Sequence, residues 1–130
     1  MPHMLMSHDV DPAKVIMNKV GKLDDFVLYG NKVLIGVYER PKVTKSGIHL
    51  ADVTRKEDQY QGKAGLILKK GPSAFVDDEN YSFRGQNVAV GDWVAIFVSD
   101  GRSIVVNGQL CRIVDDQHIR LKIPAPDVVF

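Results

Sequence analysis

Few side chains of this sequence are of the types, and at the spacings, that support chemistry. The candidates are one cysteine and four scattered histidines, namely Cys111, His3, His8, His49 and His118. Metal sites require cysteine and histidine ligands in clusters with short and regular spacings. These residues form no such cluster, so the sequence predicts neither a metal nor a cofactor.

The single cysteine, Cys111, alternates with Leu110 and Arg112 in a stretch that is typical of a strand. A free cysteine in such a position most often acts as a small buried hydrophobic residue and not as a nucleophile. One cysteine also excludes an intrachain disulfide, which fits a reducing compartment. The chain has no phosphate-binding loop, nucleophile elbow or zinc-binding HExxH helix. We therefore expect a protein that is not an enzyme.

Adjacent aspartates occur at Asp24-Asp25, Asp77-Asp78 and Asp115-Asp116. Neighbouring side chains on a strand point to opposite faces, so such pairs rarely form a shared carboxylate site. Aspartate is also favoured in turns, where its side chain can bond to the nearby backbone. We expect these pairs to lie in solvated turns.

Length and composition indicate a single folded domain. The chain has 130 residues, of which 45% are hydrophobic and 25% charged, as in ordinary globular proteins. Its formal net charge is +1, so no broad basic face for nucleic acid is expected. Met1–Val10 is too short and polar for a signal sequence, and no stretch approaches the roughly 20 apolar residues of a membrane span. We expect a cytoplasmic protein with neither nucleic acid nor membrane as a partner.

Residues 1–25 predict an N-terminal extension with one short helix. Asp11 can cap a helix that has Pro12 at its first position and Gly21 just after its end. Ile16 and Val20 would fall on one apolar face of this helix. Helices this short are marginal in water without packing, so a frayed extension is the alternative.

From Phe26 onward the hydrophobic pattern has period two, which is typical of strands. The expected strands are Val33–Glu39, Gly65–Lys69, Val88–Val90, Trp93–Val98, Ser103–Val106 and Gln109–Val114. Asp100-Gly101 and Asn107-Gly108 supply the positive φ angles of tight hairpin turns. A last apolar run, Ile119–Ile123, ends at a proline and leaves a tail at 124–130. This arrangement predicts an all-β fold, either a small barrel or a sandwich.

Two segments are longer than hairpin turns. Residues 41–61 fit neither a strand nor a helix, and a loop of this length is usually functional or disordered. Ile48 and Leu50 would share one face of this loop if it became extended, with His49 on the other face, as in a hydrophobic hook that binds a partner. The second segment, 71–87, has an acidic run and two aromatic residues, which indicates a projecting hairpin or flap.

Several motifs occur in the order found in one known family. They are Lys32–Ile35, Thr44–Leu50 (TKSGIHL), Gly65–Gly71, Val90–Phe97 and Asp100-Gly101. As an ordered set they resemble the co-chaperonin family of GroES, the lids of the large ring chaperonins. The resemblance extends from about Val27 to Ile123.

The resemblance implies a small, partly open β-barrel over residues 26–123 that assembles, in that family, into a dome-shaped heptamer. It implies that 41–61 is a mobile loop and that 71–87 is the roof hairpin of the dome. Neighbouring subunits would pair through Phe26–Leu28 and Ile119–Ile123. The protein would assist folding, with no catalytic residue, metal or cofactor, by capping a GroEL-type chaperonin in its ATP- or ADP-bound state. The loop residues implied in this contact are Gly47, Ile48, His49 and Leu50.

The chain departs from compact bacterial members of that family in its loop and at its ends. His49 replaces a residue that is usually apolar, and only Gly47 stands where the family has two glycines. The segments before Phe26 and after Pro124 suit a phage-encoded or otherwise divergent member, which would act in the host cytoplasm. One alternative is a ring-forming structural or decoration protein, for example of a virus, with the same barrel but no chaperonin partner. Another is an enzyme with the related fold of zinc alcohol dehydrogenases, whose metal ligands and nucleotide-binding half have no counterpart here.

Overall fold

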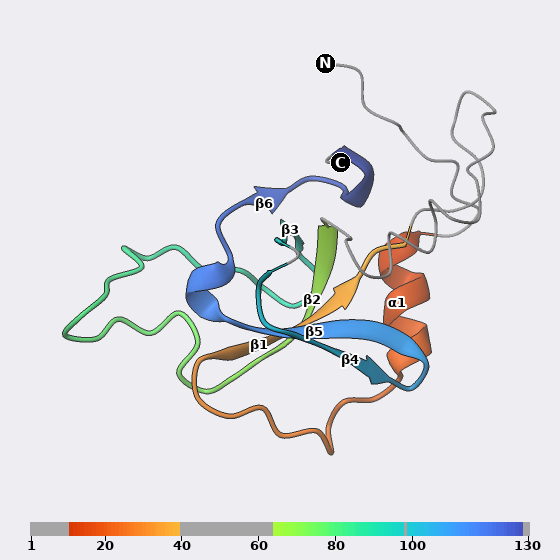
Figure 1. Cartoon of the computed structure of the whole chain (residues 1–130), viewed down its shortest axis with the longest axis horizontal. Coiled ribbons are helices and arrows are strands. Elements are labelled where there is room, and N and C mark those ends of the chain that lie inside the picture. The colour runs from red at the N-terminus through yellow and green to blue at the C-terminus, as the bar shows by residue number, and fades with distance from the viewer. Residues whose placement is uncertain (1–10, 40–63, 98, 129–130) are drawn as a thin grey trace.

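One antiparallel sheet of six strands forms the body of the protein (Figure 1). This computed structural model describes residues 11–39, 64–97 and 99–128. The strands are β1 (Lys32–Val37), β2 (Ala64–Lys70), β3 (Trp93–Ala95), β4 (Arg102–Val106), β5 (Gln109–Asp115) and β6 (Lys122–Ile123). The helices are α1 (Pro12–Val20) and the 3-10 helices η1 (Asp116–His118) and η2 (Pro126–Val128). The predicted all-β fold class is confirmed, as a small open sheet with the order β4-β5-β1-β2-β3-β6.

Two apolar clusters lie on opposite faces of the central strands. Successive side chains of a strand point to opposite faces, so Val33 and Ile35 of β1 enter one cluster and Leu34 enters the other. The helix-side cluster consists of Ile16, Val20, Leu34, Tyr38, Ala64, Leu66, Leu68, Trp93, Val106, Cys111 and Ile123. The loop-side cluster consists of Val33, Ile35, Val37, Ile67, Val88, Val94, Ile96 and Val114. Burial on both faces explains why β1 and β2 are apolar almost throughout.

Helix α1 is part of the core. Its N-cap Asp11 accepts a hydrogen bond from the N–H of Ala13 at 3.1 Å, and Ile16 and Val20 are buried in the helix-side cluster. Gly36 of β1 allows this close packing, because a Cβ there would lie 2.6 Å from Cγ2 of Ile16. The helix expected from the sequence is therefore present, and it packs against the sheet rather than fraying.

Several strands are shorter than expected, for local reasons. Val88–Val90 is not a strand, because the chain turns there to pair Gly91 N–H with the carbonyl of Ile67 at 2.8 Å. β3 ends at Ala95 instead of Val98. Phe97 is drawn into a turn with Asp100, since each N–H of the two residues bonds to an oxygen of the other. Phe26–Leu28 is not a strand in the single chain, and only Lys122–Ile123 of the last apolar run is one.

The segment 71–87 projects from the sheet without forming paired strands (Figure 1). Its far end is closed by a hydrogen bond from Asp78 N–H to the carbonyl of Tyr81 at 2.9 Å. The carboxylates of Asp77 and Asp78 accept further backbone hydrogen bonds, from Phe83 and Tyr81 respectively. The chain thus makes a projecting loop here, held by aspartate side chains instead of a strand ladder.

One expectation from the sequence falls outside the described residues. The loop at 41–61, with Gly47, Ile48, His49 and Leu50, lies entirely in the part of the chain that is not described. α1 has nine residues, and across the described segments no helix has the length and apolar character needed to cross a membrane.

Candidate functional site

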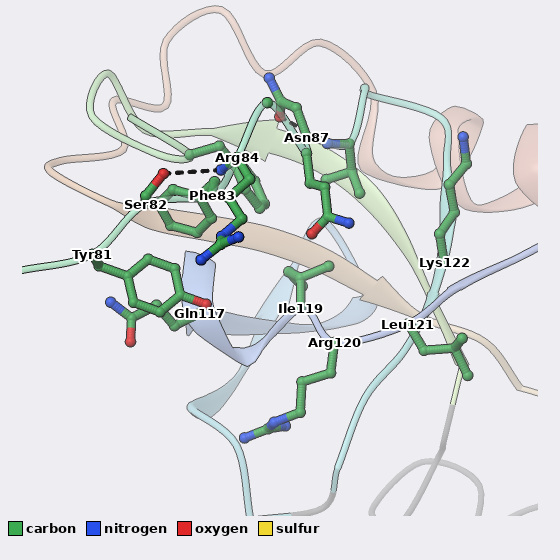
Figure 2. Close-up of a pocket in the computed structure, with 14 residues that line it drawn as sticks. Tyr81, Ser82, Phe83, Arg84, Asn87, Gln117, Ile119, Arg120, Leu121 and Lys122 are labelled. Carbon is green, nitrogen blue, oxygen red and sulfur yellow. Dashed lines mark hydrogen bonds between the residues drawn. The ribbon is translucent and has the colours of Figure 1, made fainter. Parts of the chain in front are cut away.

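A cleft of about 590 Å³ opens between the projecting loop and the segment that leads into β6 (Figure 2). One wall of the cleft is formed by Tyr81–Val88. The opposite wall is formed by Gln117 and Ile119–Lys122. The charged side chains of these walls are Arg84, Arg120 and Lys122, and none of the described residues that line them carries a carboxylate. The cleft therefore suits a ligand or partner that carries negative charge. We call it the Arg84 cleft.

Arg84 is held in the cleft by a strained turn. The N–H of Gln86 bonds to the carbonyl of Phe83 at 2.9 Å, and Arg84 and Gly85 between them have φ angles of 53° and 78°. Positive φ at both central residues is the feature of type I′ turns, which favour asparagine or glycine. The αL conformation costs an ordinary residue on the order of 1–2 kcal/mol. Figure 2 shows the guanidinium of Arg84 pointing into the cleft, between Tyr81 and Ile119.

The other two cations of the cleft have partners within the chain. Nη1 of Arg120 lies 2.9 Å from Oδ2 of Asp100, and its guanidinium lies 4.5 Å from the ring centroid of Phe97. Nζ of Lys122 lies 3.4 Å from Oδ2 of Asp92. In the described segments Arg84 has no such ion pair. It is the cation of the cleft whose charge is left for a partner.

The Asp100–Arg120 pair is largely shielded on the aspartate side. The side chain of Asp100 is only 7% exposed. Burial by itself would raise the pKa of Asp100, but the hydrogen bond and positive charge of Arg120, with the N–H of Phe97, outweigh burial and lower it below the ordinary value. Arg112 lies nearby and donates from Nη1 to the carbonyl of Phe97 at 2.7 Å. These charges fix the segment after β3 against the wall of the cleft.

The base of the projecting loop is anchored by Asp116. This residue is 3% exposed, and its two carboxylate oxygens accept hydrogen bonds from Nδ2 of Asn31 at 3.1 Å and from the N–H of Phe75 at 3.0 Å. Phe75 then contacts Phe83 with ring centroids 5.4 Å apart, and Phe83 contacts Tyr81 at 4.8 Å. A row of aromatic rings thus connects the anchored base of the loop to the cleft.

This burial corrects the expectation for the paired aspartates. Asp24 and Asp25 lie exposed in a turn, as expected, and Asp77 and Asp78 are exposed as well. Asp116, however, is buried and joins three segments that are distant in sequence. Sequence reasoning missed it because its partners, the side chain of Asn31 and the backbone of Phe75, come together only in the folded chain.

Several apolar side chains are exposed in the segment before β1 and at the two edges of the sheet. Phe26, Val27 and Tyr29 are 44%, 68% and 76% exposed, and Leu121, next to edge strand β6, is 53% exposed. At the opposite edge, Val105 of β4 is 62% exposed. Apolar residues along open sheet edges are usually covered by another chain.

Cys111 has the environment expected of a core residue. Its side chain is fully buried, and burial raises the pKa of the thiol to about 11. In the described part of the chain there is no group of three histidine, cysteine, aspartate or glutamate residues placed to hold a metal ion. Gly47, Ile48, His49 and Leu50 lie outside the described residues. Arg84, which the structure adds as a site residue, carried no sequence signal, because Arg-Gly is not a usual type I′ dipeptide.

Comparison with known proteins places this small β-sheet chain in a family. Two curated proteins named Co-chaperonin GroES, from Caldicellulosiruptor saccharolyticus and Caldicellulosiruptor bescii, are each 30% identical to it over 90 residues. The matched region covers 69% of this chain and 87% of each relative. No protein-family model matches the chain. The chain belongs to the GroES family of co-chaperonins.

Proposed function

We propose that this protein is a co-chaperonin subunit that assembles into a ring, a heptamer as in the family, and caps a GroEL-type chaperonin in its ATP- or ADP-bound state. The observation that carries the proposal is the match to 87% of the length of curated co-chaperonins. The protein assists ATP-dependent folding in the cytoplasm, or in the host cytoplasm if it is viral. It performs no reaction of its own and needs no cofactor.

The contact with the chaperonin is made by residues Gly47, Ile48, His49 and Leu50. Burying Ile48 and Leu50 would contribute roughly 1.5–3 kcal/mol each. Ordering a dozen loop residues costs about 1 kcal/mol or more apiece, so one loop binds weakly. Several loops on one ring raise the effective concentration of each further contact, by about 10²–10⁴ in affinity for a linked pair. The ring is therefore part of the binding mechanism.

The sheet supports this proposal by the way it holds the two ends of the loop. β1 and β2 pair in antiparallel register, with Val37 opposite Gly65, and Tyr38 N–H bonds to the carbonyl of Ala64 at 3.0 Å. Tyr38 also packs edge-on against Trp93 with ring centroids 5.8 Å apart. The described residues that precede and follow 40–63 thus lie at adjacent positions in the sheet. A loop anchored in this way can be presented on a rigid base.

The open edge of the sheet supports assembly. In the family, Phe26–Leu28 and Ile119–Ile123 correspond to segments that pair between neighbouring subunits. Here both segments carry exposed apolar side chains, and the sheet of the single chain ends at β6. Pairing between copies would cover them and remove the exposed edge. We propose that these segments form the interface of the ring.

Capture on an immobilised GroEL-type chaperonin, without nucleotide and with ADP or ATP, tests the function. The wild-type protein should bind only with nucleotide, and Ile48→Ser or Leu50→Ser should abolish capture without a change in melting temperature. Val76→Ser is the matched control, since Val76 is 56% exposed on the projecting loop and lies outside the segments proposed for the ring interface. A ring that binds no chaperonin under any of these conditions would instead be a structural or decoration protein.

A further inference from the structure

We propose that the Arg84 cleft receives the Asp24-Asp25 turn of a neighbouring copy of this chain. The contact rests on the proposed ring and adds what sets its direction, because a carboxylate pair of one subunit would be held by a guanidinium of the next. Arg84 and the two aspartates would then determine which surface of one subunit faces the next.

The receiving side has a charge without a partner. Arg120 and Lys122 are paired with Asp100 and Asp92, whereas Arg84 has no ion pair within the described residues. Arg84 also holds a φ of 53°, an αL conformation that most residues avoid. Strain of this kind is retained where the surrounding structure and a functional contact require it. A carboxylate would accept two hydrogen bonds from the guanidinium at once.

The donating side is a turn that presents two carboxylates. The N–H of Phe26 bonds to the carbonyl of Leu23 at 3.0 Å, which places Asp24 and Asp25 at the two central positions of the turn. Both aspartates are exposed, and among the described residues neither has an ion pair or a side-chain hydrogen bond. Phe26 and Val27, which follow directly, are also exposed. The turn thus carries an acidic tip with an apolar flank.

The other aspartate pairs are already engaged. The carboxylates of Asp77 and Asp78 accept backbone hydrogen bonds inside the projecting loop. Asp115 pairs with Lys32, and Asp116 is buried at the base of the loop. Among the described pairs, the Asp24-Asp25 turn is the one whose oxygens are left for another chain.

The apolar surroundings match as well. Leu121 and Tyr81 of the cleft wall are 53% and 43% exposed, and they offer contact area to Phe26 and Val27 of the neighbour. Removing water around an ion pair strengthens it, whereas an exposed pair contributes little. The apolar flanks would therefore make the charge contact effective.

In the proposed ring the two surfaces pair head to tail. Within one copy, no hydrogen bond or ion pair joins the turn to the cleft in the described chain, and Figure 1 shows the segment between α1 and β1 running below the sheet and the projecting loop extending to its left. A head-to-tail contact, in which the turn of each subunit enters the cleft of the next, generates closed rings or filaments. The charges then define which surface of a subunit faces the next.

Charge reversal with native mass spectrometry over a dilution series tests the contact. Arg84→Glu, or Asp24→Lys with Asp25→Lys, should raise the concentration at which half of the rings dissociate by about tenfold or more. Combining the changes in one chain should restore assembly, because the reversed charges attract again. Arg102→Glu is a control with the same charge change as Arg84→Glu, and Glu79→Lys is a control for the reversal of one acidic residue. Both residues are exposed and lie outside the two surfaces, so these variants should leave dissociation unchanged.

Arg84→Gly separates assembly from folding. Glycine adopts positive φ without strain, so this variant should melt no lower than wild type and still dissociate more easily. Unchanged dissociation of Arg84→Glu, or no rescue by the combined variant, would overturn the contact while leaving the ring in place. A wild-type protein that is monomeric at every concentration would overturn the ring itself, and the contact with it.

Discussion

Asp116 and Phe75 are 41 positions apart, and the carboxylate of the first accepts the backbone N–H of the second at 3.0 Å. The same carboxylate accepts a hydrogen bond from Asn31. One buried side chain therefore fixes the start of β1, the start of η1 and the base of the projecting loop. The loop is positioned by this residue because it has no strand ladder of its own.

Asp116→Ala should lower the free energy of unfolding by about 1–3 kcal/mol, since it leaves buried donors without an acceptor. Asp116→Asn should be only partly better, because an amide has one acceptor oxygen where the carboxylate uses two. Urea unfolding measures the free energy of unfolding. Hydrogen exchange at the amide of Phe75 reports directly on its hydrogen bond to Asp116. Asp115→Ala, which removes an exposed ion pair with Lys32, should cost no more than about 1 kcal/mol. Equal effects of the two alanine variants would contradict the role of Asp116.

The packing of α1 predicts that the helix contributes to stability. Ile16→Ala removes a buried side chain that lies against Gly36, and it should cost about 2–5 kcal/mol in the free energy of unfolding. Val15→Ala is the matched control on the same helix, because Val15 is 48% exposed, and it should change stability by less than about 1 kcal/mol. Similar urea midpoints for both variants would mean that the packing of α1 does not contribute to stability.

The Asp100–Arg120 pair predicts a loss of stability in acid. The pKa of Asp100 in the folded chain is lower than its ordinary value of 3.8. The ionised carboxylate of Asp100 therefore stabilises the fold fully above pH 3.8, and this stabilisation is lost as the pH falls through the pKa of the folded state. Asp100→Asn should be less stable than wild type at pH 7, and the difference should shrink below about pH 4. Urea midpoints measured from pH 7 to pH 2.5 show this, and a difference that stays constant over the range would rule the pair out as its cause.

Cys111 should be unreactive in the folded protein. Burial raises the pKa of its thiol to about 11, so at pH 8 it is protonated as well as inaccessible. An aromatic disulfide reagent at pH 8 should react at the rate of unfolding and not faster. Rapid labelling without denaturant would show that the helix-side cluster is open.

Much of the fold was predictable from the sequence because its signals are local. Short apolar segments located β1, β2 and β5, although β1 and β2 are apolar on both faces and do not alternate, and Asn107-Gly108 located the turn between β4 and β5. The length of β3 was not predictable, because the turn between Phe97 and Asp100 ends the strand through hydrogen bonds that depend on the fold. Asp116 and Arg84 were missed for the same reason. Their roles come from partners far away in sequence and from an unusual φ angle that the residue type does not favour.

The most direct test of the proposed capping function is a timed digestion with trypsin, read by intact mass. Lys45, Arg55 and Lys56 place cleavage sites on both sides of Ile48 and Leu50. The protein should be cut at these bonds first when it is alone, with nucleotide only, or with chaperonin only. With chaperonin and ATP together, all three bonds should be protected at once, because docking of the hook holds the flanks on either side of it. Cleavage at the same rate on a chaperonin that has demonstrably bound the protein would contradict the account.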